Sequence, residues 1–175
     1  LALCSRGEDD RRVDPEGEAK SVSSETTLDK DTADADRLRP ILWQLAETVS
    51  RRLKKSGIAG EGVTLKLKTA DFRIITRSRH LKSATQSAEE MFQAAEPLLS
   101  READGRAFRL IGIGAHDLVP ADQVMQADLF SGVGPSENKV DKALDAVREK
   151  FGDAAVMKGR GFGTKVARQG PSKVE

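Results

Sequence analysis

The stretch from Val63 to Leu81 restricts the fold more than any other, because apolar and polar side chains alternate along it with one interruption. Every second residue from Val63 to Leu67 is apolar, and the alternation resumes at Phe72 after a polar break over residues 69–71. A period of two is that of a β-strand with one buried face. Two such runs joined by a short polar segment predict an antiparallel hairpin.

Positive charge gathers on this hairpin. We expect one of its faces to carry Lys66, Lys68, Arg73, Arg77 and Arg79, with no Asp or Glu between them. A solvated outer sheet face is the simplest interpretation of such a surface. Unpaired cations on neighbouring strands repel one another, however, and this favours a surface that faces a polyanion.

Two amphipathic helices flank the hairpin. Apolar residues recur every three or four positions over residues 36–56, with Asp36 as the expected N-cap. The second helix is expected over residues 87–100, where Ser87 opens a capping box and Pro97 should bend or shorten the helix. Because each helix has a single apolar stripe, we expect both to lie on one face of a sheet.

Two further strands complete the pattern, one over residues 20–28 and one over residues 106–118. The order strand, helix, strand, strand, helix, strand predicts an α+β fold of the split β-α-β, or ferredoxin-like, type. Two helices then cover one face of a four-stranded antiparallel sheet, where Trp43 and Phe92 should be at least partly buried. The other face is left bare, and on it we expect the hairpin cations together with Ser21, Ser23 and Arg109.

The rest of the chain differs in composition. Charged residues make up 33% of the 175 residues and aromatic ones only 4%, so we expect one modest core over residues 20–118. Around it we place a flexible linker over residues 1–19, a second linker over 119–137, and a short helix with a basic tail over 138–175. The net charge of +1 means that any affinity for nucleic acid must come from an uneven distribution of charge.

The sequence also limits the compartment and the chemistry. The single cysteine, Cys4, rules out an internal disulfide framework and is typical of a cytoplasmic protein. We see no apolar run of membrane-spanning length and no signal peptide, and the lack of an initial methionine suggests a piece of something longer. His80 and His116 have no Ser or Cys at a recognisable spacing, so we expect both to be strand-end residues. We expect no catalytic residue, metal ligand or cofactor in this chain.

Three segments stand in order at separations that resemble those of a known domain. Residues 20–27 read KSVSSETT, residues 71–79 read DFRIITRSR, and residues 109–114 read RLIGIG. Together they resemble the little finger, the C-terminal domain of Y-family translesion DNA polymerases, and in particular the bacterial DNA polymerase IV group. The resemblance covers about residues 5–130, and residues 6–15 are similar to the tether between that family's thumb and little finger. The resemblance implies that residues 1–19 are the end of a thumb domain and this linker.

The resemblance implies an accessory domain of a DNA-directed DNA polymerase that grips template–primer DNA across its major-groove side through an exposed sheet. The family's catalytic carboxylates, with the Mg²⁺ expected in the parent polymerase, belong to a palm domain that has no match in this chain. We expect Arg77 and Arg79 to lead the contacts with phosphate. The other candidates for DNA contact are Lys20, Ser21, Ser23, Lys66, Lys68, Arg73, Thr76, Ser78 and Arg109.

A short motif follows the last predicted strand. Residues 126–130 read QADLF, which closely resembles the pentapeptide by which bacterial polymerases dock on the β sliding clamp. Leu129 and Phe130 lie in a stretch without periodicity, and burial in a partner's pocket would stabilise each by roughly 1.5–3 kcal/mol. Gln126 is suited to fixing the register of the peptide, Asp128 matches the motif, and Ala127 replaces a larger apolar residue. Alternatively, Leu129 and Phe130 fold back onto the domain's own core.

Two other functional classes remain open. RNA-recognition modules use the same strand order and stack bases on aromatic residues at the centre of the sheet. Here the predicted bare face offers Lys, Arg, Ser and Thr but no Phe or Trp, which argues for contact with the nucleic-acid backbone. A ferredoxin-like regulatory domain is the third class. Salt-dependent binding to duplex DNA, to single-stranded RNA or to neither would separate the three.

Overall fold

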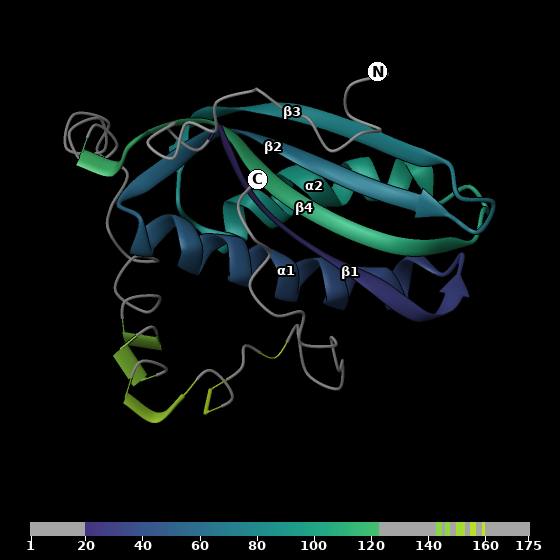
Figure 1. Ribbon diagram of the computed structural model, residues 1–175, viewed down its shortest axis with the longest axis horizontal. Helices are drawn as coiled ribbons and strands as arrows, with labels where there is room; N and C mark the ends of the chain where they lie inside the picture. Colours follow the sequence, from purple (N-terminus) through teal and green to yellow (C-terminus); the bar gives the residue numbers. More distant parts are fainter. Residues whose placement is uncertain are drawn as a thin grey trace, which may run out of the picture.

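The computed structural model describes residues 20–122 and, beyond them, residues 143–144, 146–147, 150–152, 155–156 and 159. The core consists of four strands and two helices in the predicted order (Figure 1). Their bounds are β1 Ser21–Thr32, α1 Ala35–Lys55, β2 Ile58–Thr69, β3 Ile74–Thr85, α2 Ala88–Glu102 and β4 Phe108–Pro120. Each strand ends later in the chain than the sequence pattern predicts, because pairing with a neighbouring strand continues beyond the alternating residues.

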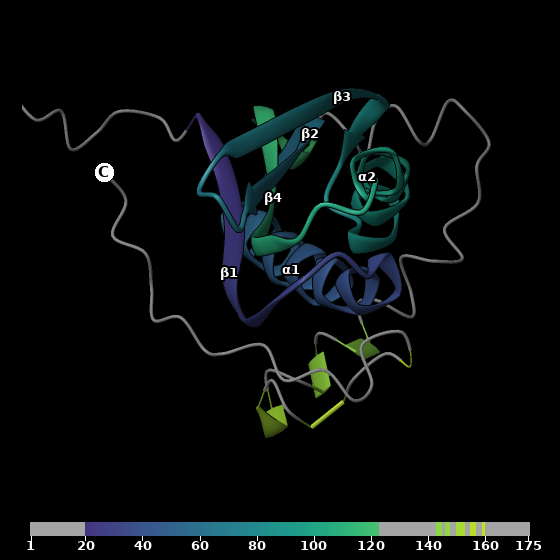
Figure 2. The same cartoon turned by 90° about the vertical axis from the view of Figure 1, so that its right-hand side faces the viewer.

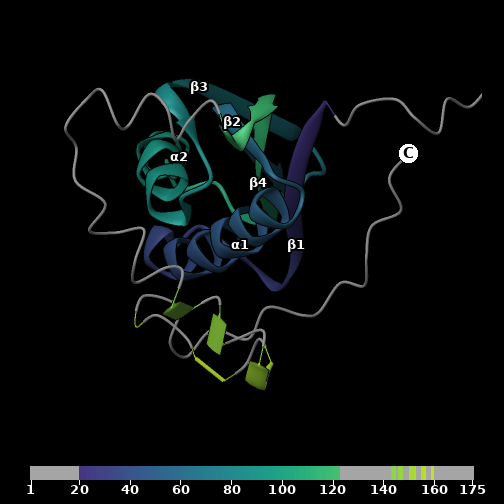
Figure 3. The ribbon, with the colours of Figure 1, turned by 90° about the vertical axis from the view of Figure 1, so that its left-hand side faces the viewer.

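The strands form one sheet in the order β1-β4-β2-β3, and all neighbouring pairs are antiparallel. Both helices lie on the same side of this curved sheet, as Figures 2 and 3 show from opposite ends. The predicted α+β, ferredoxin-like fold is therefore confirmed. The strands β1 and β3 are the two edges of the sheet, whereas β2 and β4 have partners on both sides.

The N-cap of α1 lies two residues earlier than we predict. Asp34, and not Asp36, is the cap, since its side chain accepts a hydrogen bond from the backbone N–H of Asp36. Pro40 is the sixth residue of the helix. One face of α1 is buried. The basic residues of its last turn interact favourably with the negative end of the helix dipole.

The helix α2 begins as predicted, with the Ser87 side chain accepting a hydrogen bond from the N–H of Glu90. The expectation that Pro97 shortens this helix is wrong, because α2 continues to Glu102. Leu99, two residues beyond the proline, is fully buried against the core, and this packing keeps the last turn in place.

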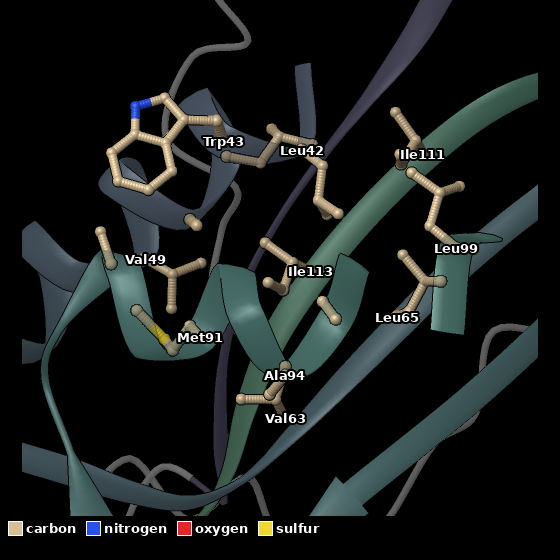
Figure 4. Close-up of a cluster of buried hydrophobic side chains, with 14 of the residues drawn as sticks. Leu42, Trp43, Val49, Val63, Leu65, Met91, Ala94, Leu99, Ile111 and Ile113 are labelled. Atoms are coloured by element: carbon tan, nitrogen blue, oxygen red, sulfur yellow. The ribbon is translucent and has the colours of Figure 1, made fainter. Parts of the chain in front are cut away.

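The core lies between the helix layer and the inner face of the sheet. Figure 4 shows residues of both helices, such as Leu42 and Met91, directed towards Val63, Leu65 and Ile113 of the strands. Trp43 and Phe92 join the two helices through an edge-to-face contact with ring centroids 5.4 Å apart. Trp43 is 1% exposed and Phe92 is partly buried, so the prediction for both residues is confirmed.

The predicted limits of the linkers and tail, at residues 1–19, 119–137 and 138–175, lie largely outside the described residues and stay predictions. Those described between 143 and 151 are helical, and Gly152 follows with a φ of 89°. No helix of the described residues is long and apolar enough to cross a membrane.

Candidate nucleic-acid interface

The register of the strands defines which side chains share the outer face, the sheet face opposite the helices. Rows of paired residues run across it from β1 through β4 and β2 to β3, and every second row faces outward. The outer rows are Ser21, His116, Gly62, His80; Ser23, Gly114, Thr64, Ser78; Glu25, Gly112, Lys66, Thr76; and Thr27, Leu110, Lys68, Ile74. The surface is therefore rich in hydroxyl groups, and four of the predicted hydroxyl residues lie on it: Ser21, Ser23, Thr76 and Ser78.

Three residues of the outer rows on the central strands are glycines, which have no side chain. A Cβ atom on Gly112 would lie 2.7 Å from the Cβ of Glu25, and one on Gly114 would lie 3.0 Å from the Cβ of Ser23. Gly62 has no room for a Cβ because the His116 ring covers it. The glycines let side chains of neighbouring strands lie across the central strands, and all three glycines are buried.

The prediction that Arg77 and Arg79 share a face with Lys66 and Lys68 is wrong. Arg77 pairs with Leu65 and Arg79 pairs with Val63, so both arginines lie on the helix side of the edge strand β3. The reason is the four-residue connection over residues 70–73, which sets the pairing register. A shift of one residue reverses the face of every side chain in a strand, and alternation alone does not fix that phase.

The expectation that these cations have no carboxylate partner is also wrong. Four of the predicted DNA-contact residues form ion pairs, each with an acidic residue outside the alternating runs of the hairpin. The pairs are Lys66 Nζ with Glu25 Oε2 at 2.7 Å, Arg73 Nε with Asp71 Oδ2 at 3.0 Å, Arg77 Nε with Glu102 Oε1 at 2.7 Å, and Arg109 Nε with Asp31 Oδ1 at 3.2 Å. Glu25 has the same parity as Ser21 and Ser23 in its strand, which is the one sequence signal of its position.

Three predicted cations form no ion pair with another described residue: Lys20, Lys68 and Arg79. Lys20 and Arg79 are exposed, at the start of β1 and on β3 respectively. Lys68 lies with its Nζ 4.7 Å from the centre of the Phe72 ring. Within residues 20–122, the predicted cations that lack a carboxylate partner therefore lie towards the borders of the sheet.

The β2–β3 turn displays an aromatic ring that the sequence pattern does not place on the surface. Phe72 is 59% exposed with a φ of 67°, and Ile74 beside it is 61% exposed. The guanidinium carbon of Arg109 lies 4.6 Å from the Phe72 ring centre, so two cations contact this ring. A hydrogen bond from the Thr69 hydroxyl, together with nearby Arg73, lowers the pKa of Asp71 in the same turn.

The two histidines face each other across Gly62 and are not strand-end residues. His116 Nδ1 lies 2.9 Å from Asp117 Oδ2, and His80 Nε2 lies 3.5 Å from the same oxygen. Asp117 has a φ of 52°, which is uncommon for a residue with a side chain. Even so, no group of three His, Cys, Asp or Glu side chains among the described residues is placed to hold a metal ion. These residues therefore do not fit the Mg²⁺ site expected of a polymerase.

The predicted clamp-binding residues Gln126, Asp128, Leu129 and Phe130 lie outside the described residues. Their role therefore stays a prediction. The same holds for the alternative in which Leu129 and Phe130 pack onto the core.

The four-stranded sheet with a hydroxyl-rich outer face and two supporting helices defines an α+β, ferredoxin-like domain. The chain belongs to the impB/mucB/samB family C-terminal domain, whose family model matches residues 19–129. It is 51% identical over 163 residues to DNA polymerase IV 1 of Mesorhizobium japonicum and 46% identical over 162 residues to DNA polymerase IV of Brucella melitensis. These matches cover 93% of this chain but only 37% and 36% of the two relatives, so the chain spans little more than a third of their length.

Solved structures share the fold. A little finger domain of PolIV, solved in complex with the β-clamp processivity factor, aligns with a TM-score of 0.50 and 24% identity over 57% of this chain and 90% of that one. A chimeric Y-family DNA polymerase aligns with a TM-score of 0.54 and 20% identity over 68% of this chain and 34% of that one. At these identities the likeness shows the fold alone. With the family match, it confirms the resemblance to the little finger of Y-family polymerases.

Proposed function

We propose that this chain is the part of a translesion DNA polymerase that holds the template–primer duplex beside the catalytic domains. The observation that carries the proposal is the outer face, which is rich in Ser and Thr and lies next to cations that form no ion pair with another described residue. Such a surface offers many donors to phosphate and few features that distinguish one base from another. Binding should therefore be largely independent of sequence.

The edge strands supply the contacts that a central strand cannot. In β2 and β4 the backbone groups are used by neighbours on both sides, whereas β1 and β3 each have one side without a strand partner. Backbone N–H groups along such an edge can donate to phosphate. Ser21 and Ser23 lie on β1, and Thr76 and Ser78 lie on β3, so four of the predicted contact residues are at the two edges.

Arg77 and Arg79 remain the leading side chains, but their route to phosphate differs from the one the sequence predicts. They leave β3 on its helix side, so they would reach DNA around the edge of the sheet. Arg79 is exposed, and the Arg77 side chain is 52% exposed despite its ion pair with Glu102. Lys66, Lys68, Arg73, Arg109 and Lys20 would add contacts on the outer face and at its ends.

The test is a salt titration of duplex binding. The double variant Arg77→Ala, Arg79→Ala should bind more weakly, and the slope of log affinity against log salt should fall by up to about 0.9 for each phosphate that is no longer neutralised. A matched control is Arg37→Ala, Arg101→Ala, since both residues are exposed cations of the helix layer. An unchanged slope in the first variant, or an equal weakening in the control, would reject the β3 edge as the contact.

The proposal extends to the parent enzyme, a DNA-directed DNA polymerase that uses Mg²⁺ for nucleotidyl transfer. In that enzyme this chain would contribute binding and no catalytic step. The RNA-binding alternative is tested in the same titration with single-stranded RNA. Preference for RNA would favour the alternative, in which Phe72 beside the outer face and His80 and His116 on it are the rings that would stack on bases.

We propose further that residues 126–130 dock on a β sliding clamp. The support is the motif itself, with Leu129 and Phe130 as apolar anchors and Gln126 and Asp128 as polar contacts. Purified clamp should bind the wild-type chain, and the variant Leu129→Ala, Phe130→Ala should lose that binding at an unchanged melting temperature. Equal affinity of the two chains would remove the motif, and a lowered melting temperature would favour packing onto the core.

A further inference from the structure

Two carboxylates of β1 form ion pairs with cations of the central strands. The Glu25 side chain reaches across Gly112 of β4 to Lys66 of β2, with 2.7 Å between Oε2 and Nζ. Asp31 meets Arg109 of β4 through a fork of two contacts, Nε to Oδ1 at 3.2 Å and an amino nitrogen to Oδ2 at 3.3 Å. Both cations are among the residues proposed to meet phosphate.

The position of Glu25 is unusual for a residue of a DNA-binding surface. It is the one acidic residue in the outer rows of the described sheet, and it lies in the same row as Gly112 and Lys66. Gly112 makes the crossing possible, because a Cβ at that position would lie 2.7 Å from the Cβ of Glu25. The carboxylate therefore lies over the central strands of the outer face, which we propose to face phosphate.

A purely structural role explains this pair poorly. The Glu25 and Lys66 side chains are 41% and 40% exposed, and ion pairs as exposed as this add little to stability. The strand β1 is already held by unbroken pairing with β4 from Ser21 to Thr27 and by buried Thr26. Removing the charge of Glu25 should therefore leave the sheet intact.

We propose that Glu25 and Asp31 are built-in competitors of phosphate, which hold Lys66 and Arg109 in the free protein and limit how tightly the domain grips DNA. The proposal rests on the function proposed above. A phosphate must displace each carboxylate before it gains the cation, so the two pairs lower both affinity and salt dependence. The consequence is a weak grip that lets the domain leave or move along the duplex.

The test compares Glu25→Gln with the wild-type chain in binding to a fluorescently labelled duplex of random sequence, across a range of salt concentrations. Glu25→Gln should bind roughly fivefold more tightly at low salt, with a slope steeper by up to about 0.9 because Lys66 then meets a phosphate. The variant Glu25→Gln, Lys66→Ala should return both values close to wild type. Asp31→Asn, which frees Arg109, provides a second, independent variant and should act in the same direction.

The matched control is Glu61→Gln, which removes one negative charge from an exposed position of β2 that forms no ion pair with another described residue. Glu61 is five residues from Lys66, about 16 Å along a strand, and its charge is largely screened at physiological salt. An equal gain in this control, or no gain in both Glu25→Gln and Asp31→Asn while the wild type binds, would overturn the inference. No duplex binding by the wild type would instead overturn the proposed function.

Discussion

The two edges of the sheet carry opposite charge. The strand β1 contains three acidic residues and one lysine, whereas β3 contains three cations and no acidic residue. Two β1 carboxylates form ion pairs with cations of the central strands, whereas Arg77 of β3 forms its ion pair on the helix side of the sheet, with Glu102 of α2. The sheet is therefore close to neutral along its β1 edge and positive along its β3 edge.

This asymmetry shows that a count of cations on a face does not measure its attraction for a polyanion. What matters is how many cations lack a carboxylate partner, and in residues 20–122 those among the predicted contacts are Lys20, Lys68 and Arg79. Arg79 lies on β3, and Lys68 lies on the neighbouring strand β2, opposite Ile74 of β3. We therefore expect the β3 side to set affinity and the β1 side to limit it.

The largest effect should come from a substitution that forces β1 away from its partner strand β4. Gly112→Ala would place a Cβ 2.7 Å from the Cβ of Glu25 and 3.3 Å from the carbonyl oxygen of Ser24, and neither atom is the end of a movable side chain. Overpacking of this kind should lower the free energy of unfolding by about 1–3 kcal/mol, measured by urea denaturation. Gly159→Ala is the control, since a Cβ there meets nothing within 4 Å. Equal stability of the two variants would mean that β1 shifts without cost.

A smaller effect should follow from releasing Arg77. Glu102 has a side chain that is 10% exposed and receives hydrogen bonds from Arg77 at 2.7 Å and Arg106 at 3.1 Å. Both arginines are about half exposed and can turn to water, so Glu102→Ala should cost about 1 kcal/mol of unfolding free energy. The freed Arg77 should at the same time tighten duplex binding. Weaker binding at retained stability would show that Glu102 positions Arg77 for DNA.

The smallest effect should appear in acid, at the turn that fixes the register of β3. The pKa of Asp71 is lowered chiefly by the Thr69 hydroxyl, and that of Asp104 is lowered chiefly by the Arg106 guanidinium. A lowered folded-state pKa stabilises the fold above the ordinary value of about 3.9 and ceases to do so as pH falls through the folded-state value. Asp71→Asn should therefore lose less stability than the wild type between neutral pH and acid. Parallel stability curves for the two proteins would contradict this expectation.

Local chemistry makes much of the fold predictable. Alternating apolar and polar residues locate the four strands, and apolar residues at every third or fourth position locate the two helices. The capping box identifies Ser87 as a cap. The N-cap of α1 is harder to place because the acidic run over residues 29–36 offers more than one Asp, and only the backbone geometry selects Asp34. The local cost of Pro97 predicts a shorter helix, whereas the burial of Leu99 keeps α2 helical.

By itself the sequence determined the element order, the helix layer, the hydroxyl-rich strands and the resemblance to the little finger family, since each depends on residues close together in the chain. The tertiary structure decided which face each hairpin cation occupies, because the phase of β3 depends on the turn over residues 70–73. It also decided the partners of those cations. Glu25, Asp31 and Glu102 are separated from Lys66, Arg109 and Arg77 by at least 25 residues. No local pattern reports such a contact, because it exists only once the sheet and α2 have packed together.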